Sequence, residues 1–174
     1  MKNINKIKIL SLWIFIVPVI ALNLCLFISV NYNLFENTLF VVDQIGRTAF
    51  TIPYIDGSVS ISRTARTYPA YLVFKPCMII TAILLIKYWI NTNTLVQNIN
   101  IESTKKKRFM MYGILSAVFL ILHSIFLGVS FEQDLYKFFR RFILLAFIVF
   151  EIVAQSLLVI ALFKIRKIIS KVIN

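Results

Sequence analysis

Glycine, cysteine, histidine and acidic residues are all scarce in this chain of 174 residues, which holds 4 Gly, 2 Cys, 1 His and 7 Asp and Glu. With so few glycines, phosphate-cradling loops are close to excluded, and no Walker, dinucleotide or G-x-S-x-G motif is present. No C-x-x-C pair and no His/Cys spacing typical of a metal site occurs. The sequence therefore predicts no cofactor, no metal site and no assignable catalytic residue, and it leaves open whether the protein is an enzyme, with a preference for none.

Hydrophobic residues, by contrast, are abundant: they make up 60% of the chain, and the mean hydropathy is +0.86. Soluble domains are about 45–50% apolar, so this chain is predicted to lie in a bilayer. Residues 9–30, 70–90, 109–130 and 142–163 are each near the ~20 residues that cross a membrane, and in lipid they must be helical. The first segment is too long for a signal-peptide core, so we expect it to be retained. The predicted fold is all-α, a single membrane domain over residues 1–174 that forms a polytopic bundle of four transmembrane helices.

The net charge of +12 is distributed unevenly between the two sides predicted by this topology. With the amino terminus in the cytoplasm, the inner side carries twelve basic residues and one acid, Glu102, whereas the outer side carries seven basic residues and five acids. The inner basic residues are Lys2, Lys6, Lys8, Lys87, Lys105, Lys106, Lys107, Arg108, Lys164, Arg166, Lys167 and Lys171. This asymmetry places both termini in the cytoplasm by the positive-inside rule. It does not indicate nucleic-acid binding, because no basic surface with exposed aromatic residues lies outside the membrane segments.

Two segments outside the helices carry further patterns. The predicted outer loop, residues 31–69, is long for so compact a protein and contains the apolar runs TLFVV and AFTIPYI. We expect it to fold back onto the membrane or to cap the bundle, either as a functional loop or as a tether. The tail, residues 164–174, alternates apolar and basic residues at helical spacing, which predicts a basic amphipathic helix on the inner leaflet.

The stretch FTIPYIDGSVSISRTARTYPAYLVFKP, residues 50–76, resembles the signature loop of the Frag/DRAM/Sfk family of polytopic membrane proteins. The resemblance covers about residues 9–90. It rests on Pro53-Tyr54-Ile55, a run of serines, then Pro69 and the pair Phe74-Lys75. Asp56 stands where the family's P-x-I-S motif has serine, the two prolines are further apart, and four helices are fewer than is usual in the family. The resemblance implies a protein that modulates or remodels membrane lipid.

The residues of this loop indicate a candidate headgroup site. Lys75 lies about one turn below the outer surface, where a charge needs an anionic partner or must extend to the interface. With Arg63 and Arg66 it could bind a phosphate or carboxylate of a lipid headgroup, because several charge-assisted donors would converge there. Asp56 is predicted to line the same site. Pro76 should kink the second helix beside this lysine.

A second candidate site lies deeper in the membrane. Glu151 and Gln155 are four residues apart on one face of the fourth segment, and the single histidine, His123, is on the third. Counted from the cytoplasmic ends at 1.5 Å per residue, His123 lies roughly 21 Å and Glu151 roughly 18 Å along their helices. We therefore expect them to meet at one depth. Such a pair could relay protons, or it could simply join two helices by a hydrogen bond.

Two classes of function follow from these patterns. One is a protein that binds or helps to remodel lipid at the outer leaflet; the other is a non-catalytic structural or accessory subunit of a membrane complex, and a proton-coupled transporter component is a weaker third. The predicted partners are membrane lipids and no nucleic acid, while other membrane subunits or a homo-oligomer stay open. The location predicted is the inner membrane of a bacterium. Cys25 and Cys77 lie at similar depth, and the sequence leaves open whether they pair or pack as free thiols.

Overall fold

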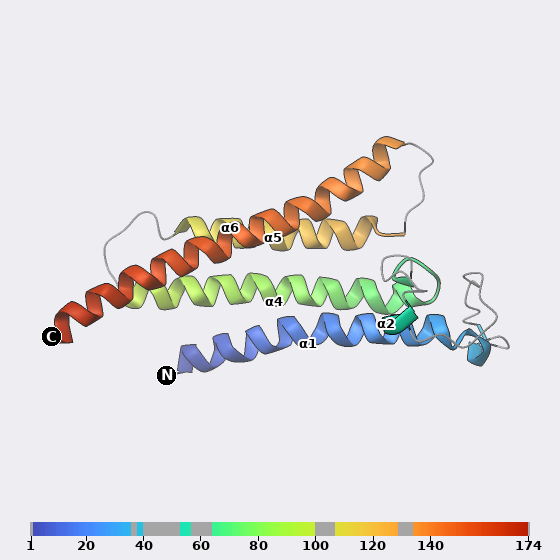
Figure 1. Cartoon of the computed structure of the whole chain (residues 1–174), viewed down its shortest axis with the longest axis horizontal. Coiled ribbons are helices and arrows are strands. Elements are labelled where there is room, and N and C mark those ends of the chain that lie inside the picture. The colour runs from blue at the N-terminus through green and yellow to red at the C-terminus, as the bar shows by residue number, and fades with distance from the viewer. Residues whose placement is uncertain are drawn as a thin grey trace.

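The computed structural model describes residues 2–35, 38–39, 53–56, 64–99, 107–128 and 134–173. In these residues every regular element is a helix, which confirms the predicted all-α fold for this part of the chain (Figure 1). The elements are α1 (Lys2–Val30), the 3₁₀ helix η1 (Tyr32–Phe35), the short α2 (Pro53–Asp56), α4 (Ala70–Ile99), α5 (Lys107–Phe126) and α6 (Asp134–Ile173).

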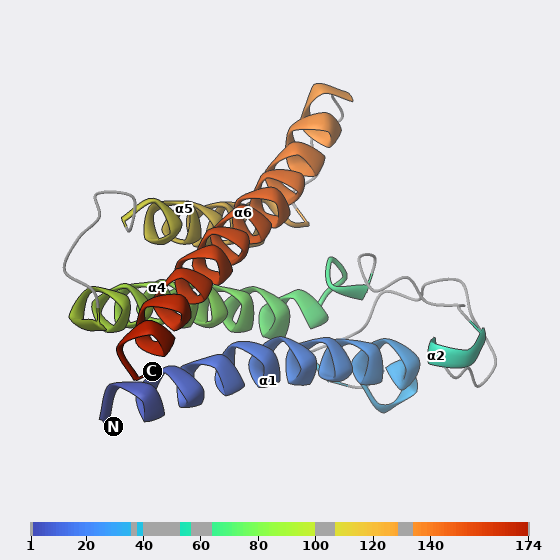
Figure 2. The same cartoon turned by 60° about the vertical axis from the view of Figure 1, so that its left-hand side comes forward.

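Four of these helices are long and apolar enough to cross a membrane, as the hydropathy of the sequence predicts. The candidate spans are Asn3–Val30, Ala70–Asn98, Arg108–Phe126 and Phe138–Lys164. At 1.5 Å per residue each of them reaches or approaches the ~30 Å of a hydrocarbon core. Because the four helices alternate in direction, both chain termini lie at one end of the molecule (Figures 1 and 2). We call this the terminal end, and we call the opposite end, where α1 finishes and α4 begins, the loop end.

The helices do not stop where the hydropathy changes. α4 continues to Ile99 rather than residue 90, and α6 begins at Asp134 rather than residue 142, because polar residues outside the hydrocarbon continue a helix without difficulty. α5 is shorter than predicted and ends at Phe126. The reason is Gly128, whose φ of 82° lies in the left-handed region that commonly ends a helix.

The four long helices pack mainly in chain order: α1 against α4, α4 against α5, and α5 against α6. α6 runs diagonally across α5 in both views, and its contact with α4 is slight (Figures 1 and 2). α1 therefore has one main neighbour among the described elements. In the described residues the four helices of the predicted bundle thus form an open layer, in which α1 and α6 each have one main neighbour.

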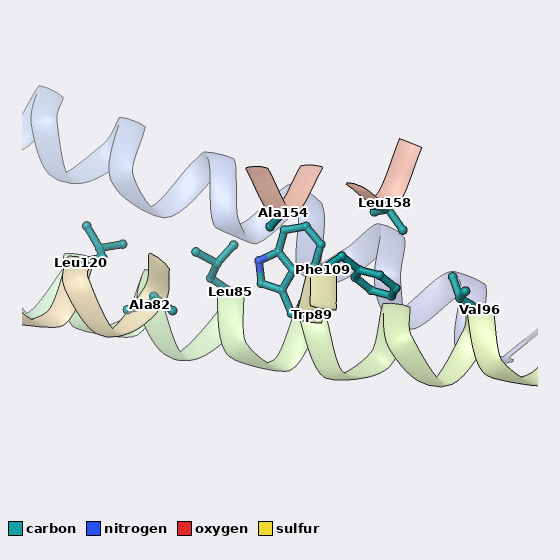
Figure 3. Packing of buried hydrophobic residues seen from close by; sticks show 9 residues of the cluster. Ala82, Leu85, Trp89, Val96, Phe109, Leu120, Ala154 and Leu158 are labelled. Atoms are coloured by element: carbon teal, nitrogen blue, oxygen red, sulfur yellow. The ribbon is translucent and has the colours of Figure 1, made fainter. Parts of the chain in front are cut away.

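The main core lies where α4, α5 and α6 meet (Figure 3). Trp89 of α4 is fully buried and packs against Phe109 of α5, with ring centroids 6.1 Å apart, while Ala154 of α6 lies beside it. The indole fits because α5 carries Gly113 opposite it: a Cβ built on Gly113 would overlap the Trp89 ring. A small residue on one helix allows the large residue of the next to enter, which is the usual basis of close helix packing in membranes.

A second, smaller core closes the loop end. It consists of Cys25, Ala65, Ala70, Phe74 and Leu127, which come from α1, the segment before α4, α4 and the end of α5. Residues 64–69 thus pack onto the helices rather than extending away from them, as expected for a loop that caps the helix ends. Earlier in the loop, the Tyr54 hydroxyl of α2 donates a hydrogen bond to Asn23 Oδ1 of α1 at 2.8 Å. Of residues 36–63 in the predicted loop, the structure describes 38–39 and 53–56.

Candidate functional sites at Glu151 and at the loop end

Glu151 of α6 is inserted into the layer and is bound by all three helices of the main core. Its Oε2 atom lies 2.6 Å from Ser116 Oγ of α5 and accepts a longer bond of 3.4 Å from Trp89 Nε1 of α4. Its Oε1 atom accepts a hydrogen bond from Gln155 Nε2, one turn along α6, at 2.9 Å. The two oxygens therefore have three polar partners, and the side chain joins α4, α5 and α6 at one point.

The local sequence explains why this acid can be held inside the membrane. Ser116 follows Gly113 by three residues, and residues at this spacing lie on one face of a helix. The glycine that makes room for the Trp89 indole and the serine that binds Glu151 therefore share one face of α5. Trp89 brings its ring N–H to the same place, because an indole that is fully buried needs a partner for its single donor. Gln155 lies four residues after Glu151 on the same helix, where side chains meet.

No cation is among the hydrogen-bond partners described for Glu151, which are a hydroxyl, an indole N–H and an amide. Tyr88 of α4 is a titratable side chain near enough to Glu151 to interact with it electrostatically. Lys87, two residues before Trp89, is exposed on the outside of α4. The carboxyl group is therefore satisfied by neutral donors from within the helix layer.

The predicted pairing of His123 with Glu151 is wrong. The residue of α5 that binds Glu151 is Ser116, and His123 lies seven residues further on, about 10.5 Å along the helix at 1.5 Å per residue. The His123 Nδ1 atom is buried without a hydrogen-bond partner. Counting from the helix ends failed because α6 crosses α5 at an angle, so residues at equal counts do not face each other (Figure 2). The predicted proximity of Glu151 and Gln155 is confirmed.

Lys75 of α4 lies at the loop end, against the last turn of α5. Its Nζ atom donates to the Ile125 carbonyl oxygen at 3.4 Å and lies 5.3 Å from the centre of the Tyr71 ring. Carbonyl oxygens at the end of a helix carry partial negative charge, so an ammonium is favourable there. Lys75 thus both caps α5 and brings a positive charge to the loop end.

The structure describes the other residues of the predicted headgroup site to different extents. The Arg66 main chain lies beside Gly128, just after α5, because a Cβ on that glycine would contact the Arg66 carbonyl oxygen at 3.5 Å. Arg66 and Lys75 are therefore both brought to the same end of α5. Asp56 is the last residue of α2, but its side chain lies outside the described residues, as does the whole of Arg63.

A third cation at the loop end was not predicted from the sequence. Arg140 of α6 is half-buried and lies close enough to His123 to interact with it electrostatically. Next to it, Tyr136 donates a hydrogen bond to the Phe126 carbonyl oxygen at 2.7 Å, and Phe126 packs edge-on against both Tyr136 and Phe139. These contacts tie the start of α6 to the end of α5. In the sequence, the pair Arg140-Arg141 just before the fourth apolar segment could have indicated this cation. In the prediction of topology the pair contributes only to the charge of the outer side.

Comparison with known proteins gives no matching family model, no matching curated protein and no matching solved structure. The resemblance to the Frag/DRAM/Sfk family therefore stays a prediction.

Proposed function

We propose that this protein is an integral membrane protein that binds the anionic headgroup of a membrane lipid at its loop end. The observation that carries the proposal is the gathering of basic side chains from three helices: Lys75 of α4, His123 of α5 and Arg140 of α6. Glu151 is the one acidic residue whose side chain the structure describes, and it is bound in the main core rather than here.

The depth of these residues supports a lipid as the partner. Tyrosine is enriched at membrane interfaces, where its ring stays in apolar surroundings and its hydroxyl reaches polar groups. Tyr68 and Tyr71 lie with ring centroids 6.0 Å apart at the start of α4, and Tyr136 lies at the start of α6. Lys75 and Arg140 each follow one of these tyrosines, Tyr71 and Tyr136, by about one helical turn, which supports a position near the lipid phosphates. Charge-assisted hydrogen bonds to phosphate are among the stronger ones that proteins make.

We assign the loop end to the extracytoplasmic side, because the basic residues near the ends of the helices are concentrated at the terminal end. The membrane is proposed to be the inner membrane of a bacterium. On this assignment the bound lipid belongs to the outer leaflet of that membrane.

Native mass spectrometry of the delipidated protein with added phosphatidylglycerol or phosphatidylcholine tests this function. We expect the wild type to retain phosphatidylglycerol preferentially, and we expect a Lys75→Met, Arg140→Gln double variant to lose most of that preference. Lys87→Met is the matched control, since it removes one charge from an exposed position of α4 away from the loop end. Equal retention of the two lipids by the wild type would contradict the proposal, and so would an equal loss in the control.

A second candidate, an accessory subunit of a membrane complex, is favoured by the open arrangement of the helices. α1 packs chiefly on α4, and large apolar side chains on its other sides are exposed, among them Leu12, Trp13, Phe15 and Phe27. Lipid tails can cover such a surface, and so can a further transmembrane helix. Co-purification of a stoichiometric membrane protein, with no lipid selectivity, would favour this second function over the first.

A further inference from the structure

Gln155 of α6 is an exposed polar residue deep inside a candidate membrane span, Phe138–Lys164. It lies nine residues before the end of that span, about 13.5 Å along the helix. Its one hydrogen bond among the described residues is donated by Nε2 to Glu151 Oε1 at 2.9 Å. A side-chain amide has two N–H hydrogens and an oxygen that accepts, so one hydrogen and the oxygen are left for a further partner. Lipid tails cannot supply that partner, and an unpaired amide in hydrocarbon is costly.

Gln155 also belongs to a row of exposed side chains that runs along α6. The residues of this row are separated alternately by three and four positions, which is the spacing at which two helices pair along a shallow crossing. Left-handed pairs of this kind are the commonest in membrane bundles. All members other than Gln155 are large, apolar and exposed, and we call the whole row the α6 seam: Leu145, Ile148, Ile152, Gln155, Val159 and Leu162.

The α6 seam lies away from the described remainder of the chain. The buried apolar residues of α6 are Ile143, Ala146, Ala154 and Leu158, none of which belongs to the seam. α5 is the main neighbour of α6, which crosses it diagonally, and the contact of α6 with α4 is slight (Figure 2). In the part of the chain that the structure describes, the seam is therefore free to receive another helix.

We propose that the α6 seam is the interface through which two copies of this chain form a dimer, with their two Gln155 amides paired within it. Two copies inserted in the same orientation and related by a twofold axis along the membrane normal place residue 155 at the same depth in both. An amide both donates and accepts, so each Gln155 can give its remaining hydrogen to the oxygen of the other.

This self-complementarity favours a second copy over other occupants of the seam. A different membrane helix would need a polar residue of its own at the depth of Gln155, whereas a second copy always has one there. A single polar residue in an apolar seam also fixes the register of the two helices. The seam is separate from the lipid site at the loop end, so either proposal can fail without the other.

Energy transfer between copies that carry a donor or an acceptor fluorophore at the carboxyl terminus measures the dimer. The full chain is reconstituted into phosphatidylcholine vesicles over a series of protein-to-lipid ratios. We expect the wild type to dimerise and Gln155→Leu to lower the association constant about tenfold, because two hydrogen bonds between helices are lost together. Ser156→Leu is the matched control, since it changes the neighbouring exposed polar residue outside the seam and should associate like the wild type.

Cysteine crosslinking in the native membrane locates the interface and gives an answer even if Gln155→Leu fails to fold. Under mild oxidation Ile152→Cys and Val159→Cys should each yield a covalent dimer of the chain. Ile160→Cys, which is exposed but lies outside the seam, should yield no more dimer than the wild type with its own two cysteines.

Four results would overturn the proposal. A wild type that is monomeric at every protein-to-lipid ratio would show that lipid covers the seam. An equal loss of association in Ser156→Leu would show that Gln155 has no special part in the contact. Equal crosslinking through Ile160→Cys would place the interface elsewhere, and crosslinks from the seam to a different membrane protein would identify another occupant.

Discussion

Replacing Gly113 with alanine tests the packing on which the Glu151 site depends. The added Cβ would overlap the indole of Trp89, and the three atoms nearest to it all belong to that ring. Trp89 is fully buried, so the ring has little room to move away. Overpacking of a tight core costs about 1–3 kcal/mol, and alanine recovers up to about 1 kcal/mol of helix propensity over glycine. Because the overlap is with a rigid ring, we expect the high end of the first range and a net loss of about 2 kcal/mol.

The free energy of unfolding can be measured in mixed micelles by titration with a denaturing detergent, followed by circular dichroism. A double-mutant cycle separates the clash from the helix propensity: in a Trp89→Phe background Gly113→Ala should cost less, with a coupling of at least about 0.5 kcal/mol. Trp13→Phe is the matched control, because Trp13 lies on the exposed side of α1 and should show no coupling. If Gly113→Ala stabilises the wild type, or if the coupling is the same with Trp13→Phe, the described fit between α4 and α5 is wrong.

Three further outcomes are expected. Brominated lipid tails should quench the fluorescence of Trp13, which is 49% exposed, and not that of Trp89, which is 0% exposed. Variants that keep one tryptophan at a time allow the two to be measured separately. Equal quenching of both would contradict the helix arrangement. Tyr136→Phe should lower the free energy of unfolding by about 1 kcal/mol through loss of its bond to the Phe126 carbonyl oxygen, whereas an unchanged value would mean that the bond is absent. Tyr54→Phe should speed proteolysis of the loop with little change in unfolding, because it frees α2 from Asn23; an unchanged cleavage rate would refute that contact.

The hydropathy of the sequence was sufficient for the number and class of the helices, because the cost of unpaired backbone groups in lipid leaves no alternative to helices for apolar runs of this length. It was not sufficient for their ends. α5 ends just before Gly128 because of the backbone conformation of this glycine. That conformation cannot be predicted from the hydropathy of residues 109–130. The number of helices does not determine which of them touch, and the described contacts arrange the four helices as an open layer.

The sequence identified Glu151 as a polar residue in the membrane but assigned it the wrong partner on α5. Histidine is the conspicuous titratable residue of α5, whereas the residue that binds Glu151, Ser116, is a common polar one. What decides the partner is the crossing of α6 over α5 and the space made by Gly113, and both depend on how side chains pack in three dimensions. A serine three residues after a glycine that faces a tryptophan is the pattern that could have indicated it.

For Lys75, too, the sequence predicted the need for a partner but not the partner itself. Its depth in the second segment predicted a charge in need of an anionic partner, and the structure provides the α5 carbonyl end and the Tyr71 ring as its neighbours. Neither neighbour can be read from the sequence around Lys75, because Ile125 lies 50 residues away.

The most direct test of lipid binding at the loop end is photocrosslinking in the native membrane with a phosphatidylglycerol that carries the reactive group on its headgroup. Mass spectrometry of the labelled protein should place the adducts in the peptides around Lys75 and Arg140, and the Lys75→Met, Arg140→Gln variant should lose them. Labelling spread evenly along the chain, or confined to the basic residues of the terminal end, would contradict the account.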